Sequence, residues 1–185
     1  MSTNITQFSW PASFSCTIVN DQLILPTIYN INISIDPESQ SQLSVNTGFK
    51  KLRSFVDVRL QNSIFIFKEN PLIRPFETIH NNQVVFPTEP YDYFVGCVLY
   101  KKLLAITEKY FQIEFITIDS LVGDHVQYTI GDPEESGLDL SGDFWWNKDT
   151  LDTGCSDDIT WDDLNIDVEP KFAPKVIQGG LSEGQ

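Results

Sequence analysis

Apolar residues in the first 36 positions follow the pattern of β-strands. The stretches SFSCTIV and QLILPTIYNINISID are rich in β-branched residues, and in the second one isoleucines alternate with asparagine and serine. A period of two places apolar side chains on one face of a strand and polar ones on the other. Residues 13–36 are therefore predicted to form two strands, with Pro26 at a bend between them or at an edge position.

The spacing of the apolar positions changes to three or four residues in two later stretches. This spacing runs from Val45 to Leu60 and predicts an amphipathic helix near residues 43–60, although Gly48 costs such a helix about 1 kcal/mol relative to alanine. A second helix is predicted near residues 90–110, after the helix-start residues Thr88 and Pro90. Lysine and arginine are expected on the remaining sides of both helices.

Four short apolar runs complete this part of the pattern and predict strands: NSIFIFKEN, QVVFP, QIEFITID and HVQYTIG. The predicted order is two strands, a helix, two strands, a helix and two strands. This order is typical of an α+β fold, with two helices on one face of a largely antiparallel sheet.

No apolar period persists beyond Gly131, where GDPEESG combines turn formers with charge. Glycine and aspartate interrupt every short apolar group in the rest of the chain, as is typical of an extended segment. We therefore predict an α+β domain over residues 1–130, followed by an extended acidic, tryptophan-containing C-terminal segment over residues 131–185.

The negative charge of the protein is concentrated in this C-terminal segment. The chain has a formal net charge of −14, and residues 131–170 hold thirteen acidic residues against one lysine. Such a surface repels DNA, RNA and anionic membranes, which bind proteins through Lys and Arg. We expect no direct nucleic-acid binding and no membrane binding, and a protein partner or a neighbouring subunit with a basic groove.

Three of the four tryptophans lie within the C-terminal segment. Indole rings bury a large area and anchor many interfaces, and acids around them keep an extended chain soluble and steer it to a basic surface. We predict that all three tryptophans are buried, and that the acids bracketing Trp161 meet Lys or Arg. The predicted partner-binding residues are Phe144, Trp145, Trp146, Asp157, Asp158, Trp161, Asp162, Asp163 and Leu164.

Two surfaces are candidates for receiving the C-terminal segment. One is the chain itself, because seven of the nine bases of residues 1–130 fall on the two predicted helices. The other is a different protein or a neighbouring subunit of a homo-oligomer, and a partner that displaces the segment would reconcile the two. The predicted docking residues on the helices are Lys50, Lys51, Arg53, Arg59, Lys101, Lys102 and Lys109.

Signatures of enzymes and metal sites are few. The chain has no GxxxxGK[ST], GxGxxG or GxSxG motif. Glu77 and His80 have the spacing of a carboxylate–imidazole pair but lack further ligands, and the aspartates before Gly154 do not match a calcium loop. Cys97, within an apolar helix, is expected to be a buried thiol. We predict no catalytic residues, no metal site and no cofactor.

The cysteines and the N-terminus bear on the compartment. Cys16, Cys97 and Cys155 are odd in number and far apart, which favours a reducing compartment, and MSTNITQFSW lacks the pattern of a signal peptide. A cytoplasmic location is expected, or a virion if the protein comes from a phage.

These features favour a non-enzymatic protein-interaction or assembly function that uses the acidic, aromatic segment. The composition resembles that of bacteriophage accessory and virion proteins, with no motif behind the resemblance. Two alternatives stay open: an inhibitor that mimics the charge of DNA and binds a nucleic-acid-binding protein, and an enzyme of unrecognised class. Charge mimicry predicts acids spaced along a ridge like phosphates, whereas an assembly component predicts a segment buried between subunits.

Overall fold

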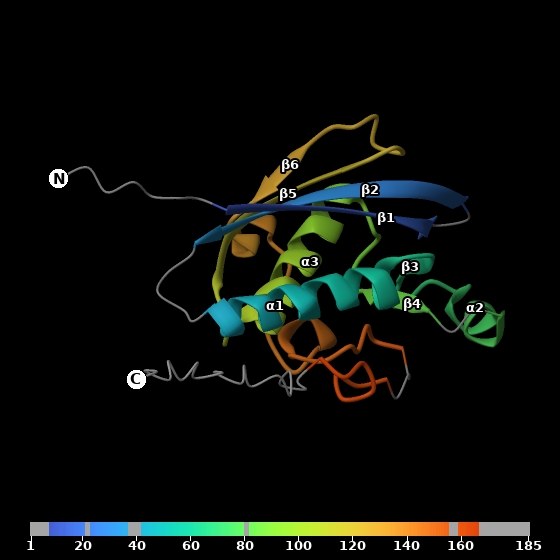
Figure 1. The fold of residues 1–185 in the computed structure, drawn as a ribbon. Helices are drawn as coiled ribbons and strands as arrows, with labels where there is room; N and C mark the ends of the chain where they lie inside the picture. The colour runs from blue at the N-terminus through green and yellow to red at the C-terminus, as the bar shows by residue number, and fades with distance from the viewer. Residues whose placement is uncertain (1–7, 21–22, 37–41, 80–81, 156–158, 167–185) are drawn as a thin grey trace, which may run out of the picture.

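The part of the chain that the structure describes is built on a mixed six-stranded sheet, with helices packed beneath its long strands in the view of Figure 1. The computed structural model describes residues 8–20, 23–36, 42–79, 82–155 and 159–166. Its strands follow the order β4-β3-β1-β2-β5-β6. Their bounds are β1 (Phe8–Asn20), β2 (Leu23–Asp36), β3 (Ser63–Phe67), β4 (Gln83–Phe86), β5 (Gln112–Ser120) and β6 (Tyr128–Ile130).

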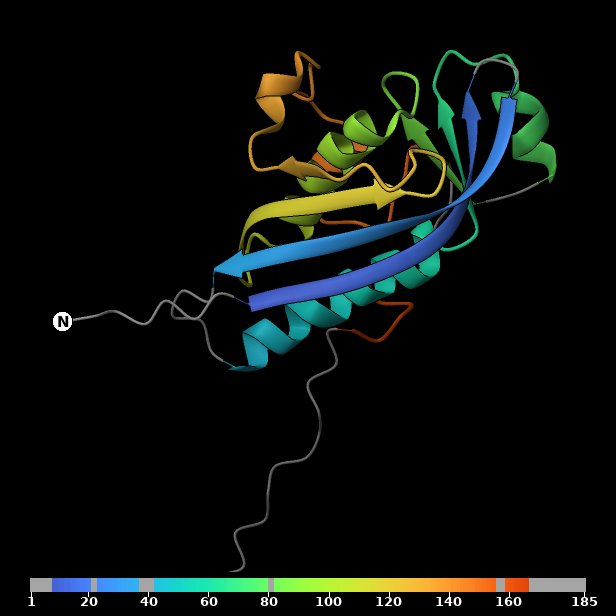
Figure 2. The same ribbon diagram turned by 90° about the horizontal axis from the view of Figure 1, so that it is seen from above.

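The long β1–β2 hairpin connects the two ends of the sheet (Figure 2). β1 pairs with β2 along its whole length, from Phe8↔Ile35 to Asn20↔Leu23. β3 joins only the last part of β1 in parallel, with β4 parallel beyond it, whereas β5 joins only the second part of β2, antiparallel, with β6 beyond it. Pro26 lies in β2 before the β5 pairing begins, so it occupies an edge position, where its missing N–H breaks no ladder.

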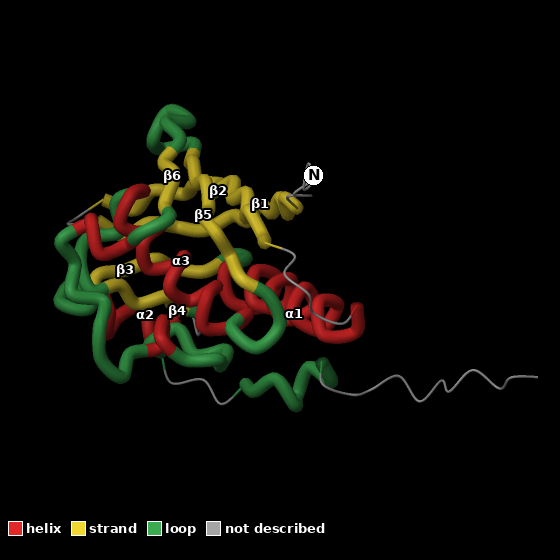
Figure 3. The backbone as a smooth tube through the Cα atoms, turned by 90° about the vertical axis from the view of Figure 1, so that its left-hand side faces the viewer, coloured by secondary structure: helices red, strands yellow, loops and turns green. Residues whose placement is uncertain are grey.

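Two helices cover one face of the sheet, as the sequence predicts (Figure 3). They are α1 (Gln42–Phe55), which continues in a π-helical turn over Val56–Leu60, and α3 (Asp92–Thr107). The inward-facing residues of β1 and β2, such as Phe14 and Ile31, pack in one hydrophobic cluster with Leu52 of α1 and Leu99 of α3. The α+β fold predicted from the sequence is confirmed.

A third helix, α2 (Ile73–Ile79), packs on the opposite face and was not predicted. A second cluster there joins Val19 and Ile66 to Phe76. Neighbouring strand residues such as Ile18 and Val19 belong to different clusters because successive side chains point to opposite faces. The seven-residue helix is too short for an apolar period, and Pro75 lies in its first turn.

Gly48 lets α1 approach the chain that follows α3. A Cβ atom on Gly48 would lie 2.5 Å from Cε1 of Phe111 and 2.8 Å from Cβ of Tyr110. The helix therefore tolerates the lower helix propensity of glycine in exchange for close packing.

The C-terminal segment contributes to the main hydrophobic cluster. Its described part contains two short 3₁₀ helices, Pro133–Ser136 and Trp145–Asn147. Its buried apolar side chains belong to the same cluster as β1, β2, α1 and α3, namely Leu140, Trp145, Trp146, Leu151, Trp161 and Ile166. The division of the chain at Ile130 into two folding units stays a prediction, and described residues on both sides of it form one cluster.

Candidate functional site

The C-terminal segment lies over three buried basic side chains of α1, its π-helical turn and α3. Lys51, Arg59 and Lys102 are only 3, 2 and 0% exposed. All three are among the residues predicted to receive the segment, which covers them and supplies their hydrogen-bond acceptors. Burial of a cation is costly unless such acceptors compensate for lost water.

Lys102 binds the backbone of the first tryptophan turn. Its Nζ donates hydrogen bonds of 2.8 Å to the carbonyl of Trp145 and 2.9 Å to the carbonyl of Lys148. The same atom lies 5.5 Å from the ring centres of Phe55 and Trp145. Burial lowers the pKa of Lys102 to about 7, because the charged form loses more hydration than the carbonyls and nearby carboxylates return.

Lys51 binds a side chain and an aromatic ring of the segment. Its Nζ lies 3.0 Å from Oδ2 of Asp149 and 5.0 Å from the ring centre of Trp161. The indole N–H of Trp161 donates to Oδ1 of the same carboxylate at 3.0 Å. Burial alone would lower the pKa of Lys51, but its bonds to Asp149 and Tyr110 outweigh burial and raise it.

Arg59 completes the set of buried cations. Its Nε donates a 2.6 Å hydrogen bond to the carbonyl of Leu151, and the Leu151 side chain is fully buried. The three basic side chains thus bind residues 145–151 through three backbone carbonyls and one side-chain carboxylate.

The C-terminal segment also covers the outer edge of β4. The amide of Val85 donates to the carbonyl of Thr153 at 2.9 Å, and the hydroxyl of Thr153 donates to the carbonyl of Gln83 at 2.6 Å. The indole N–H of Trp145 donates to the carbonyl of Val85 at 2.8 Å. Gly154 follows with φ +84°, where a Cβ atom would lie 3.0 Å from Val85. An uncovered strand edge invites pairing with other chains, so this contact protects β4.

The predicted burial of the three tryptophans is confirmed. Trp145, Trp146 and Trp161 are 4, 4 and 8% exposed, and each indole N–H donates to a backbone carbonyl. They pack against their own chain, which is one of the two surfaces considered above. Phe144 is 47% exposed, and Leu164 is half-buried.

The acid that meets the buried Lys51 is Asp149, which was not among the predicted partner-binding residues. Asp163 instead accepts hydrogen bonds from the amide and hydroxyl of Thr160, both at 2.8 Å, and these bonds lower its pKa. Within the described residues, neither Asp162 nor Asp163 forms an ion pair, so their contact with a Lys or Arg of a partner stays a prediction. Two other predicted partner-binding residues, Asp157 and Asp158, lie outside the described residues.

The other four predicted docking bases do not lie beneath the segment in the same way. Lys50, Arg53 and Lys109 are exposed. Lys101 is half-buried and borders a hollow lined by Pro133 and Leu140 of the segment. The structure therefore brings Lys51, Arg59 and Lys102 to the segment and leaves most of the remaining bases on the surface.

Most acids of the described segment face outward. One lysine opposes them, Lys148, whose Nζ lies 3.2 Å from Oδ1 of Asp143 in an exposed ion pair. Hydrogen bonds from the hydroxyl and amide of Ser141 lower the pKa of Asp139. We name the exposed acids the acidic surface: Asp132, Glu134, Glu135, Asp139, Asp143, Asp162 and Asp163.

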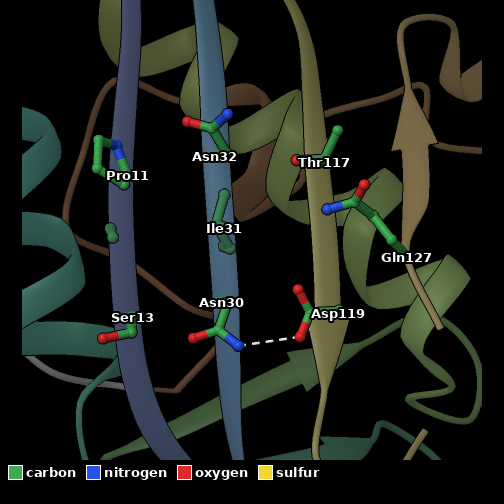
Figure 4. Close-up of a pocket in the computed structure, with 9 residues that line it drawn as sticks. Pro11, Ser13, Asn30, Ile31, Asn32, Thr117, Asp119 and Gln127 are labelled. Atoms are coloured by element: carbon green, nitrogen blue, oxygen red, sulfur yellow. Dashed lines mark hydrogen bonds between the residues drawn. The ribbon is translucent and has the colours of Figure 1, made fainter. Parts of the chain in front are cut away.

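The face of the sheet opposite α1 and α3 has a different character. It has a hollow of about 420 Å³. Figure 4 shows residues that line it, including polar side chains of β1, β2 and β5 and of Gln127, just before β6. In it the amide of Asn30 donates to Oδ1 of Asp119 at 2.9 Å, and Nδ1 of His125 lies 3.1 Å from the same oxygen. The carboxylate of Asp119 is thus bound by Asn30 and His125. The hollow is open to solvent rather than enclosed by other elements.

A second, partly buried carboxylate, that of Asp92, ties α3 to the sheet. The hydroxyl of Tyr29 donates to Oδ1 of Asp92 at 2.7 Å, and the hydroxyl of Ser120 donates to Oδ2 at 2.7 Å. Burial, followed by the charge of Asp92, raises the pKa values of Tyr29 and of nearby Cys16. Both groups therefore stay protonated at neutral pH, which fits a structural network better than a nucleophile and its base.

The candidate metal ligands do not converge in the described part of the chain. No group of three His, Cys, Asp or Glu side chains there could hold a metal ion. His80, considered with Glu77, lies outside the described residues. Cys97 is fully buried, and burial raises its pKa, as expected for a structural thiol.

The described elements define an α+β protein whose acidic segment packs against its helices. Every helix in this part of the chain falls short of the length and apolar character that crossing a membrane demands. No family model and no curated protein sequence matches the chain. Among solved structures, the uncharacterized protein WS1659 from Wolinella succinogenes is similar, with a TM-score of 0.51 and 12% identity over 68% of this chain and 97% of that chain. This likeness concerns the fold alone.

Proposed function

We propose that this protein is a non-enzymatic interaction protein whose acidic surface binds a basic groove on a protein partner or a neighbouring subunit. One observation carries the proposal: the segment uses its tryptophans, backbone carbonyls and Asp149 to bind its own chain, while seven other acids stay exposed. Its fixed backbone presents those carboxylates in a defined arrangement. Such preorganisation lowers the entropy cost of binding, and the charge speeds encounter with a basic partner.

The tryptophans have a supporting role in this proposal. Because they are buried against α1, α3 and β4, they hold the segment in place rather than meet the partner. In the described part of the segment, Phe144 is the large aromatic side chain that offers apolar area to a partner, at 47% exposure. Of the predicted partner-binding residues, Phe144, Asp162 and Asp163 keep that role.

Charge-neutralised variants test the proposal better than truncation at residue 130, which would remove part of the hydrophobic cluster. Four exposed acids of the acidic surface are changed together: Glu134→Gln, Glu135→Gln, Asp143→Asn and Asp162→Asn. A matched control makes the same change in net charge elsewhere on the exposed surface: Glu69→Gln, Glu77→Gln, Glu108→Gln and Asp124→Asn.

Each variant is used as bait in extracts of the source organism. We expect the wild type and the control to retain one abundant protein partner, and the acidic-surface variant to lose it. Equal recovery by all three baits would contradict the proposal. Competition by duplex DNA for a captured nucleic-acid-binding protein would favour the charge-mimicking inhibitor instead.

A further inference from the structure

A groove with an aromatic floor and two basic side chains lies on the outer side of α1, next to the first part of β1. It has a volume of about 520 Å³. The rings of Trp10 and Phe49 on its floor have centroids 6.4 Å apart, and Leu43 at its border is 53% exposed. Lys50 and Arg53, one helical turn apart, line it with exposed side chains. We name these five residues the basic groove.

The charges of the basic groove are available for a ligand. Among the described residues, neither Lys50 nor Arg53 forms an ion pair, although the neighbouring Lys51 pairs with Asp149. A half-exposed aromatic floor beside two unpaired cations complements a ligand in which an apolar side chain lies next to carboxylates. Aromatic and arginine side chains are the residue types that most often carry interface energy.

The acidic surface presents a group of that chemistry. The exposed ring of Phe144 stacks on the buried ring of Trp146, with centroids 4.7 Å apart and planes 17° apart. This stacking fixes the Phe144 ring, so its ordering on binding costs little entropy. Asp143, whose side chain is 92% exposed, precedes it, and Asp139 is exposed nearby in the chain. We name Phe144, Asp139 and Asp143 the acidic knob.

We propose that the basic groove of one copy of this chain binds the acidic knob of a second copy. This inference rests on the proposed function, because it names the partner of the acidic surface. With a net charge of −14, two copies repel one another over most orientations, and an exposed pair of bases facing a pair of acids is a contact that reverses this repulsion. The knob and the groove are different surfaces, so the contact is head to tail and continues into a ring or a filament.

Sedimentation velocity over a range of protein concentrations tests the proposal. Salt of about 0.15 M limits the overall repulsion to about 8 Å while close ion pairs persist. The wild type is expected to form dimers and then larger species as its concentration rises. The knob variant Phe144→Ala and the groove variant Lys50→Glu/Arg53→Glu should each weaken association at least ~10-fold. The control Lys68→Glu/Arg74→Glu, with the same charge change at exposed positions, should assemble like the wild type.

A mixture of the two variants distinguishes this geometry from other contacts. The groove variant keeps its knob and the knob variant keeps its groove, so the mixture can form one productive contact per pair. At a concentration where each variant alone is monomeric, we expect the mixture to form a 1:1 complex that does not grow. All substituted side chains are exposed, and unchanged circular dichroism would verify that the fold is retained.

Three results would overturn the proposal: a wild type that stays monomeric, variants that assemble like the wild type, and a mixture without a 1:1 complex. A monomeric wild type whose captured partner is still lost on neutralising the acidic surface would leave the proposed function standing. A monomeric wild type whose captured partner is lost from the groove variant alone would assign the groove to a different protein, and would also overturn the second-copy assignment.

Discussion

Nζ of Lys102 donates a 2.8 Å hydrogen bond to the backbone carbonyl of Trp145, 43 residues further along the chain. Because Lys102 is 0% exposed, its head group has no water to replace this partner. A second carbonyl, that of Lys148, accepts at 2.9 Å, so the two N–H groups of a neutral amine are both satisfied. The contact fixes the first tryptophan turn to α3 and thereby positions the acidic surface.

Lys102 is predicted to make stability rise with pH above neutrality. Its pKa is about 7 in the folded protein and 10.5 ordinarily, so between these values the unfolded chain binds one more proton than the folded one. The free energy of unfolding then increases with pH across this window by up to about 1.4 kcal/mol per unit, and the gain is lost as pH falls towards 7.

Urea unfolding at pH 7, 8 and 9 checks this for the wild type and for Lys102→Met, which cannot titrate at this position. The free energy of unfolding of the wild type should rise with pH relative to that of Lys102→Met. Parallel curves would contradict the prediction, as would an NMR titration that places the pKa of Lys102 near 10.5.

Trp145→Phe is predicted to destabilise the protein by about 1–3 kcal/mol, because it leaves the carbonyl of Val85 without its indole donor and removes buried ring volume. Hydrogen exchange at the Val85 amide, which is bonded to Thr153, should speed up if the cover of β4 loosens. Trp10→Phe is the matched control, since Trp10 lies away from β4. Slow exchange at Val85 in the Trp145 variant would show that Thr153 covers the edge alone.

Asp149→Asn is predicted to cost about 1–3 kcal/mol of unfolding free energy, because it leaves the buried Lys51 without its counter-charge. The pKa of Lys51 should fall, and Trp161 fluorescence should shift to the red as its contacts loosen. Asp143→Asn removes the exposed pair with Lys148 and should change stability little. Equal effects of the two substitutions would rule out a special role for the buried pair.

Gly48→Ala is predicted to destabilise the protein by about 1–3 kcal/mol, although alanine is the better helix former by about 1 kcal/mol. The added Cβ would lie 2.5 Å from the ring of Phe111, which is itself buried and cannot move freely. Ser54→Ala in the same helix, where such a clash is not expected, should leave stability unchanged or raise it slightly. Thermal unfolding of both variants decides whether propensity or packing dominates at Gly48.

The sequence by itself determined the elements with a sustained apolar period. β1, β2, β5, α1 and α3 were predicted near their observed positions, since alternation and helical spacing are local consequences of burying one face. It also determined that the three tryptophans are buried, because exposing large indole surfaces forfeits hydrophobic free energy whatever the fold. The short α2 was missed because its burial depends on strands that only the folded sheet brings beneath it.

Only the tertiary structure decided which charges are buried and what they meet. Hydropathy assigns Lys51, Arg59 and Lys102 to the solvent, since burying an unpaired cation is costly. Their acceptors lie 43 to 98 residues away in the sequence, on carbonyls and on Asp149, and no local pattern records that these groups converge. The acids next to Trp161 were a reasonable choice by sequence distance, but the chain path brings Asp149 to Lys51 and turns Asp162 and Asp163 outward.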